Sequence, residues 1–351
     1  MKILLTADPE LPIPPTLYGG IERIVYSLIK NYVELGHDVT LCGNQDSEVP
    51  CRLVAWPGKR SQNRIDTLRN MATLSMLIYK EHFDVLHSFS RLAYITAVFP
   101  TKVPKVMSYQ REPTLRQVKK AVNLSKKNTM VFTGCSNYIT DKLKTVADAH
   151  TIYNCVPVET YAYKQRVERD APLMFLGRIE EIKGTHIAIE VAKKANRSLI
   201  IAGNIPTGQE RYFEEKIKPH LNDQISYVGA VNDEQKSELL GKCLAFLMPI
   251  QWNEPFGIVM AEAMACGTPV LGFPMGSVPE VIEDGVNGFI CKDVDEMAGR
   301  VSDCYQIDRK TVRQIAEQRF SNETIAAGYL RLYQELIEKT RKNLKKKSLR
   351  Q

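Results

Sequence analysis

The sequence predicts an α/β protein made of two doubly wound, Rossmann-like domains. Short apolar runs alternate with longer amphipathic segments, as in βαβ units that build a parallel sheet. The 351 residues are enough for two such domains. The alternation starts again after a charged, non-periodic stretch at residues 158–170, which we interpret as a linker. We therefore predict an N-terminal domain over 1–165, a C-terminal domain over 166–330, and a C-terminal helix with a basic tail over 331–351.

The composition is that of an ordinary globular protein, with 44% apolar and 25% charged residues. No apolar run reaches the length of about 18 residues that a membrane-spanning helix needs. The first apolar run is followed at once by Asp8 and several prolines, so it predicts a strand and not a signal peptide. We expect a cytoplasmic protein. The eight cysteines form no C-x-x-C pair, which argues against a metal site and a disulfide framework.

The net charge of +7 is unevenly distributed along the chain. Residues 1–165 carry a net +7, residues 166–338 a net −7, and the tail from 339 to 351 a net +7. Such asymmetry is informative about partners and says little about the fold.

Each element of the first half follows from its residue pattern. Residues 11–15 hold three prolines and predict a loop. Residues 21–35 have apolar side chains at helical spacing and end before Gly36, which suits a helix C-terminus. The predicted strands are 2–7, 38–42, 83–89, 104–108, 130–136 and 151–157, and the predicted helices are 21–35, 65–79, 114–128 and 137–146.

The second half repeats this rhythm. Its apolar runs are short and end in glycine or proline, as buried strands do, and the segments between them are good helix formers. The predicted strands are 172–176, 198–202, 225–228, 243–248 and 270–273, and the predicted helices are 185–195, 209–218, 233–240, 258–266 and 324–344.

The stretch from residue 249 to residue 270 carries the chemistry. It leaves a predicted strand, is interrupted at Pro255 and Gly257, and continues as a helix. A helix that begins after a glycine-containing loop offers backbone N–H groups and a positive dipole end to an anion such as a diphosphate. Glu254 on the loop and Glu262 in the helix can accept hydrogen bonds from sugar or ribose hydroxyls. An ordinary strand–loop–helix with two solvated glutamates is the alternative.

This stretch resembles the signature of the family-four, GT-B-type retaining glycosyltransferases. The resemblance rests on Glu254-x7-Glu262 with Pro-Phe-Gly inside it, followed by Glu-Ala-Met-Ala-Cys-Gly-Thr-Pro-Val. It covers about residues 1–338. It implies two Rossmann-like domains facing a cleft, with the final helix packed back on the first domain. It also implies a nucleoside diphosphate sugar as co-substrate, with cations and helix dipoles in place of a metal or another cofactor.

The resemblance implies roles for residues that match the family's motifs. Gly177-Arg178 with Lys183-Gly184 matches Gly-Arg-x4-Lys-Gly, and Gly19-Gly20 matches the glycine loop after the first strand. The implied diphosphate-binding residues are Gly19, Gly20, Arg178, Lys183, Phe256, Gly257 and Ile258. The other implied roles are contact with the donor sugar for Glu254, with the ribose for Glu262, and with the base for Gly203 and Val231. No metal ligand is implied.

His87 is a second candidate catalytic residue beside Glu254. It falls near the end of a predicted strand, where open α/β sheets bind ligands. Its Asp-Val-Leu-His context is similar to the family's Asp-Val-hydrophobic-His motif, whose histidine region lines the sugar site. A structural histidine is the alternative. The chain departs from the family at Phe89, where many members have a second histidine, and at Cys155 and Ser277, which replace glycines.

The sequence therefore predicts a retaining glycosyltransferase that uses a UDP- or GDP-sugar, with an acceptor hydroxyl in cell-envelope glycan, glycolipid or secondary-metabolite glycosylation. A GT-B-fold nucleotide-sugar epimerase is the alternative among enzymes. A non-catalytic basic protein that binds membranes or polyanions is the alternative outside them. The latter rests on the basic helix at 114–128 and on Lys345-Lys346-Lys347, which also predict a peripheral contact with an anionic membrane. No nucleic-acid partner is expected.

Overall fold

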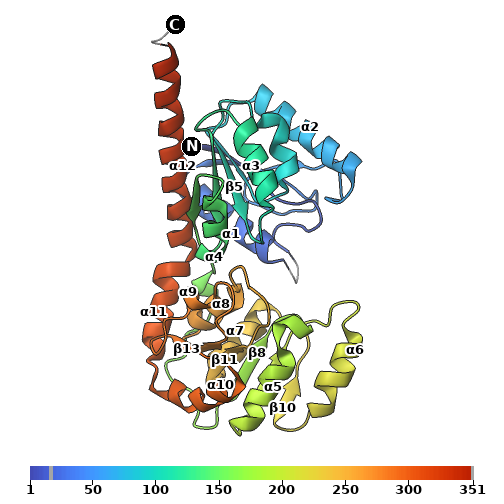
Figure 1. Ribbon diagram of the computed structural model, residues 1–351, viewed down its shortest axis with the longest axis vertical. Coiled ribbons are helices and arrows are strands. Elements are labelled where there is room, and N and C mark those ends of the chain that lie inside the picture. Colours follow the sequence, from blue (N-terminus) through green and yellow to red (C-terminus); the bar gives the residue numbers. More distant parts are fainter. Residues whose placement is uncertain (16–18, 349–351) are drawn as a thin grey trace. The chain divides into compact units, whose positions relative to one another are not determined.

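The chain folds into two compact units, each built on its own parallel sheet (Figure 1). The computed structural model describes residues 1–15 and 19–348, with the backbone alone for 343–348. The first unit contains Met1–Cys155 and the chain from Asn322 on, and the second is Val156–Ser321. The two α/β domains predicted from the sequence are confirmed. In the described part of the chain, no helix is both long and apolar enough to cross a bilayer.

The sheet of the first unit has seven parallel strands in the order β3-β2-β1-β4-β5-β6-β7. The strands are β1 (Lys2–Thr6), β2 (Asp38–Gly43), β3 (Arg52–Ala55), β4 (Val85–Ser88), β5 (Lys105–Tyr109), β6 (Met130–Gly134) and β7 (Ala149–Thr151). Ile3, Leu4 and Leu5 of β1 are fully buried, because both faces of a parallel sheet are covered. The sequence did not predict β3, a short strand at the edge of the sheet whose side chains stay partly exposed.

Five α-helices belong to the described part of this unit: α1 (Gly20–Glu34), α2 (Arg64–Lys80), α3 (Leu115–Leu124), α4 (Asn137–Lys144) and α12 (Asn322–Ser348). A 3-10 segment, η1 (Leu92–Val98), follows β4. The side chains of Asn63 and Ser136 cap α2 and α4. The hydroxyl of Tyr333 in α12 lies 3.1 Å from that of Tyr32 in α1. The final helix thus packs on the first unit, as expected (Figure 1).

The second unit has six parallel strands in the order β10-β9-β8-β11-β12-β13. The strands are β8 (Leu173–Leu176), β9 (Leu199–Ala202), β10 (Ile225–Tyr227), β11 (Ala245–Met248), β12 (Val270–Gly272) and β13 (Gly288–Ile290). The helices are α5 (Thr185–Lys194), α6 (Glu210–Tyr212), α7 (Asp233–Lys242), α8 (Ile258–Ala265), α9 (Val278–Val281), α10 (Val294–Arg300) and α11 (Arg309–Phe320), with shorter turns η2 (Val158–Thr160), η3 (Glu181–Lys183), η4 (Phe213–Ile217), η5 (Lys218–His220) and η6 (Ser302–Gln306).

Several boundaries differ from the predicted ones for physical reasons. The units divide at Val156 and not at residue 165, because Tyr161 packs in the second unit and donates a hydrogen bond to Glu262. The second division lies at Ser321, where α11 ends and α12 begins. The predicted helix at 209–218 is split into α6, η4 and η5, the last with Pro219 in its first turn, where proline lacks an amide donor.

His87 lies in the interior of the first unit, which corrects its assignment as a catalytic residue. It is fully buried within β4. Its Nδ1 atom lies 2.5 Å from the Tyr333 hydroxyl and its Nε2 atom 2.6 Å from the Ser108 hydroxyl. The ring of Phe89, which stands where a second histidine was expected, packs against the imidazole at 4.2 Å between ring centres. With both nitrogens bonded, His87 fastens α12 to the sheet and does not touch a substrate from this position.

We expect His87 to make stability fall as the pH drops. Burial lowers the pKa of His87 to about 3, below its value in the unfolded chain, so the folded state holds the neutral ring. This contribution is complete above the unfolded pKa of about 6.5 and is lost toward pH 3, by up to about 1.4 kcal/mol per pH unit. Chemical denaturation of wild type and His87→Gln at several pH values should show a shallower pH dependence for the variant.

The control for this comparison is His82→Gln, because the His82 side chain is 85% exposed in the same unit. This variant should keep the wild-type pH dependence. Parallel curves for wild type and His87→Gln would show that the buried ring does not set the acid sensitivity of this unit.

Candidate active site

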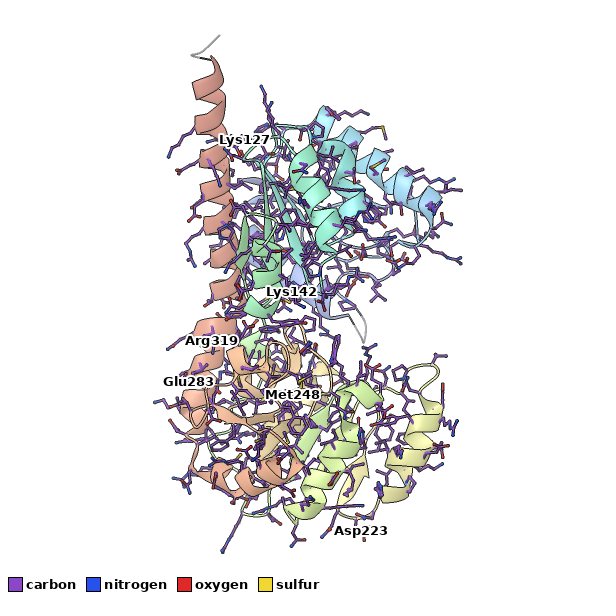
Figure 2. The ribbon with its side chains drawn as sticks, in the orientation of Figure 1. Lys127, Lys142, Asp223, Met248, Glu283 and Arg319 are labelled. Atoms are coloured by element: carbon purple, nitrogen blue, oxygen red, sulfur yellow. The ribbon has the colours of Figure 1, made fainter. Side chains whose placement is uncertain are left out.

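The polar residues predicted for the second unit follow neighbouring strands. The chain passes from β8 through β9 to β10 on one side and then returns to β11 on the other side of β8. The loops after β8 and β11 therefore diverge at a topological switch point, where open α/β sheets bind ligands. Arg178 and Lys183 follow β8, and Glu254 follows β11, whose last residue is Met248 (Figure 2). The sheet brings these distant parts of the sequence to one edge.

Lys183 and Glu254 form an ion pair at this edge. Lys183 Nζ lies 2.6 Å from Glu254 Oε2, and the two side chains are 17% and 12% exposed. The indole N–H of Trp252 donates to the same oxygen at 3.1 Å, and the Lys183 ammonium lies 4.8 Å from the centre of the indole ring. No described residue donates to Oε1 of Glu254, and water reaches that oxygen. One oxygen thus fixes the carboxylate, and the other is available to a ligand.

Two glycines fix the loop that carries Glu254. Gly257 precedes α8 with a left-handed backbone, φ 70°, and no described side chain caps the helix. Gly276 is also left-handed, φ 60°, and a Cβ there would lie 2.3 Å from the Glu254 carbonyl oxygen. Ser277 donates its backbone N–H to that oxygen at 2.9 Å and its hydroxyl to the carbonyl of Phe256 at 2.9 Å. The serine that replaces a family glycine therefore binds the loop, and the backbone at 256–258 lies at the start of α8.

Arg178 and Gly184 complete the loop after β8. The Arg178 guanidinium lies 2.8 Å from Oε1 of Glu180 and its side chain is 37% exposed, so solvent reaches the charge. Gly184 is left-handed, φ 75°, and a Cβ there would lie 2.0 Å from the carbonyl oxygen of Pro249. The loop bearing Lys183 is thus held against the loop bearing Glu254 by a backbone contact that excludes any side chain.

The residues predicted to border the base are held by their own unit. Gly203 lies against Gly177, where a Cβ would be 1.7 Å from the carbonyl oxygen. The N–H of Gly203 donates to the carbonyl of Gly229 at 2.8 Å, and its carbonyl accepts from the Tyr227 hydroxyl at 2.8 Å. Val231 is half-buried in the segment before α7. The backbone of Gly203 can therefore offer a base one further hydrogen bond, to the second lone pair of its carbonyl oxygen.

Glu262 is more enclosed than the sequence predicts. Its side chain is 6% exposed, and its Oε1 atom lies 2.5 Å from Lys236 Nζ and accepts from the Tyr161 hydroxyl at 2.7 Å. Lys236 also lies 3.1 Å from a carboxylate oxygen of Asp233. Both contacts of Glu262 use one oxygen. No donor among the described residues reaches Oε2, and this oxygen is not among the fully buried atoms that lack a partner. Sequence reasoning missed Lys236 and Tyr161, since neither belongs to a recognisable spacing with Glu262.

The glycine loop of the first unit lies after β1. Gly19 has φ 154°, and a Cβ there would lie 2.7 Å from Pro15. A Cβ on Gly20, the first residue of α1, would meet no atom of the described chain within 4 Å. No described side chain caps α1. Packing therefore requires Gly19, whereas Gly20 has room for a Cβ among the described residues, and the carboxylate of Glu22 lies close to this helix start.

A hollow of roughly 210 Å³ opens beside this helix start, after the adjacent strands β4 and β5. Its lining includes Ile21, Ser90, Arg91, Gln110, Arg111 and Gln117. The side-chain nitrogen of Gln110 is buried and has no partner among the described residues. Sequence reasoning missed this hollow, although a polar pair follows each of the two strands.

Asp8 lies beside the arginines of the hollow. It accepts a hydrogen bond from the backbone N–H of Arg91 at 3.1 Å and lies 3.8 Å from the Arg111 guanidinium. Burial, opposed by that hydrogen bond and assisted by the charge of Glu10, raises the pKa of Asp8 to about 6. A carboxyl with such a pKa can accept a hydroxyl proton or a hydrogen bond near neutral pH. Among the described residues, no group of three His, Cys, Asp or Glu side chains is placed to hold a metal ion.

The chain matches two families in succession. Residues 18–160 match the family described as Glycosyltransferase Family 4, and residues 161–320 match Glycosyl transferases group 1. Spore coat protein SA of Bacillus subtilis (strain 168) is 24% identical, over 95% of this chain and 99% of its own length.

Two solved structures have a similar fold. A glycosyltransferase involved in avilamycin A biosynthesis superposes with a TM-score of 0.74 at 24% identity, covering 96% of this chain and 98% of its own. An Anabaena protein, HepE, in complex with UDP and glucose, also gives 0.74, at 20% identity over 95% of this chain and 99% of its own. The two family matches together cover residues 18–320 and show that this protein belongs to the glycosyltransferases of family 4 and group 1, and the similarity to solved structures along most of the chain agrees with the GT-B fold.

Proposed function

We propose that the protein moves a sugar from a UDP- or GDP-sugar to an acceptor hydroxyl and retains the anomeric configuration. The observation that carries this proposal is the Lys183–Glu254 pair at the switch point of the second sheet, beside the uncapped start of α8. A cation and a helix N-terminus suit a diphosphate, and a carboxylate with one oxygen available suits sugar hydroxyls. The structural similarity to a protein in complex with UDP and glucose supports this choice of ligand.

The cations and backbone amides would stabilise the leaving diphosphate. Arg178 offers a forked set of donors and Lys183 a compact charge, and both follow β8. The N-terminus of α8 adds the positive end of its dipole. Stabilisation of charge that grows in the transition state is usually the largest catalytic contribution. We propose that these groups act without a metal ion.

The two glutamates would hold the donor by its hydroxyls. Oε1 of Glu254 would accept from the donor sugar, while Lys183 and Trp252 fix Oε2. Oε2 of Glu262 would accept from the ribose, while Lys236 and Tyr161 fix Oε1. We assign no enzyme nucleophile, and we propose that the leaving phosphate helps to take the proton of the acceptor. The hollow beside Asp8 and Arg111 in the first unit would hold the acceptor.

A peripheral membrane contact is a second proposal, favoured by the exposed basic face of α3. Arg116, Lys119 and Lys120 are exposed, whereas Val118 of the same helix is buried in the unit. Val122 and Leu124 remain exposed at 37% and 60%. The side chains of the tail run at 345–347 lie outside the described part of the chain.

Replacing Glu254 by Gln should reduce turnover far more than stability. The amide keeps the size of the side chain but removes the negative charge that pairs with Lys183 and strengthens hydrogen bonds from sugar hydroxyls. We therefore expect kcat to fall roughly 100-fold or more. The measurement is sugar transfer or donor hydrolysis, with thermal melting beside it. The exposed Glu283 of the same unit (Figure 2) gives the matched control Glu283→Gln, which should act like wild type. Unchanged turnover in Glu254→Gln would remove Glu254 from the site.

A thermal-shift panel with UDP, GDP, ADP and TDP, followed by their sugar conjugates, tests the proposed donor. A ligand that binds the folded state alone raises the melting temperature by mass action. We expect one nucleotide to dominate, the shift to be equal in EDTA, and Arg178→Gln to diminish it. A shift that disappears in EDTA would overturn metal independence, and no shift with any nucleotide would oppose the transferase proposal.

Lys236→Met should weaken recognition of the ribose in particular. The variant removes the cation that fixes Glu262, so the affinity ratio between the preferred nucleotide and its 2′-deoxy form should fall about tenfold, the size of one charged hydrogen bond. Lys242→Met is the matched control, because Lys242 is exposed on the same helix and pairs with Glu238. Equal losses for both nucleotides would mean that Lys236 has a structural role alone.

A further inference from the structure

Helix α2 exposes a continuous apolar stripe. Ile65, Leu68, Met76 and Tyr79 are 61%, 58%, 54% and 72% exposed, and the exposed Ala72 lies between them. Their spacing of three, four, four and three residues places all five on one face of the helix. Side chains of this size are seldom exposed together on a monomeric protein unless the surface binds something.

The stripe is not the core-facing side of the helix. Leu74, Leu77 and Ile78 are buried, and the amide of Asn70 is bonded to the backbone of Gly58. These residues lie on the opposite face and hold α2 against its own unit. The helix therefore has two apolar faces, one satisfied by the fold and one left in water. Figure 1 shows α2 at the side of the first unit away from α12, so α12 does not cover the stripe.

The charges around the stripe are almost all positive. On the helical wheel, Arg64 flanks one side of it, and Arg69 and Lys80 flank the other. The loop that leads into the helix adds two exposed cations, Lys59 and Arg60.

Asp66 is the single acid between residues 57 and 80, and its charge is largely engaged. Its side chain is 17% exposed and lies 3.9 Å from Arg69. It also accepts hydrogen bonds from the backbone N–H groups of Lys59 and Arg60, at 3.2 and 3.1 Å. The exposed surface of α2 is therefore positively charged, and a strip of apolar side chains runs along it.

We propose that α2 docks the first unit on an anionic lipid bilayer. Ile65, Leu68, Met76 and Tyr79 enter the boundary between headgroups and acyl chains, and the flanking cations contact lipid phosphates. A helix with a narrow apolar face between cations lies in the plane of such an interface. If two copies of this helix faced each other, the cations of both copies would come together, and each copy would contribute a single acid to offset them. This repulsion disfavours self-association.

This inference goes beyond sugar transfer, because it uses neither Glu254 nor the nucleotide site. It differs from the contact of α3 in supplying apolar insertion along a whole helix. A substitution on α2 can therefore abolish membrane binding without affecting nucleotide binding, and a substitution in the nucleotide site can do the reverse. A variant of α2 that keeps the wild-type circular dichroism and the nucleotide-induced thermal shift is folded in both units and has an intact donor site.

Co-sedimentation of the full chain with vesicles tests the proposal. Wild type should bind phosphatidylcholine vesicles that contain about 30% phosphatidylglycerol, and bind pure phosphatidylcholine weakly. Leu68→Glu with Met76→Glu should lower the partition coefficient roughly tenfold or more, because each carboxylate would have to enter the interface. The matched control is Val228→Glu with Tyr305→Glu, on apolar side chains of the second unit that are 46% and 41% exposed. It should bind like wild type.

The electrostatic contribution of the cations and the insertion of the apolar side chains into the bilayer can be measured separately. Arg64→Gln with Arg69→Gln should weaken binding to anionic vesicles and flatten its salt dependence. Lys119→Gln with Lys120→Gln on α3 is the comparison and should have the smaller effect. Met76→Trp should give indole emission that shifts to the blue with vesicles and is quenched by brominated lipid, because the side chain leaves water.

Four outcomes would overturn the proposal. Wild type fails to bind anionic vesicles, or the Leu68/Met76 variant binds them as well as wild type does. The tryptophan at position 76 shows no shift on vesicles that the protein binds, or the α3 variant alone reduces binding. A dimer in solution that the Leu68/Met76 variant dissociates, without vesicle binding by wild type, would assign the stripe to a second copy of the chain.

Discussion

The parallel pairing of β8 with β11 is the constraint on which the candidate site depends. It aligns the carboxyl ends of two strands that are about seventy residues apart in the chain, so that Lys183 and Glu254 meet at 2.6 Å. Gly184 and Gly276 then press their backbones against the loop after β11, at distances that exclude a side chain. The sheet brings the two loops together, and the close backbone contacts at the glycines fix the position of the loop that carries Glu254.

Both glutamates of the motif are held in the same way. Each gives one carboxylate oxygen to a lysine and to an aromatic N–H or O–H donor, Trp252 for Glu254 and Tyr161 for Glu262. The pairing gives each partly buried carboxylate a cationic partner and fixes its orientation. In the proposed donor complex, the second oxygen of each glutamate is already oriented for a hydroxyl, so less ordering would be needed on binding.

The first unit uses its polar residues for two different purposes at neighbouring positions. His87 and Ser108 point into the interior and fasten α12 through Tyr333 and Tyr329. The next residues out, after the ends of β4 and β5, line an open hollow with Gln110 among them. Ser108 also lines this hollow, so the buried hydrogen-bond network adjoins the surface that can bind a ligand. The exposed stripe of α2 is a third, separate surface of this unit.

The sequence by itself determined the fold class and the strand–loop–helix around Glu254, because buried parallel strands and helix stops are local patterns. It singled out Arg178 and Lys183 through their match to the family's Gly-Arg-x4-Lys-Gly motif, and the structure places both after β8. It could not assign His87, since a histidine at the end of a strand has the same local pattern whether its ring faces solvent or the core. It did not predict Lys236 and Tyr161 beside Glu262, or the hollow near Asp8. These contacts join residues from separate parts of the chain, and no regular spacing in the sequence links them. Whether Leu68 and Met76 lie inside or outside was decided by which face of α2 packs on its unit, and only the tertiary structure settles that choice.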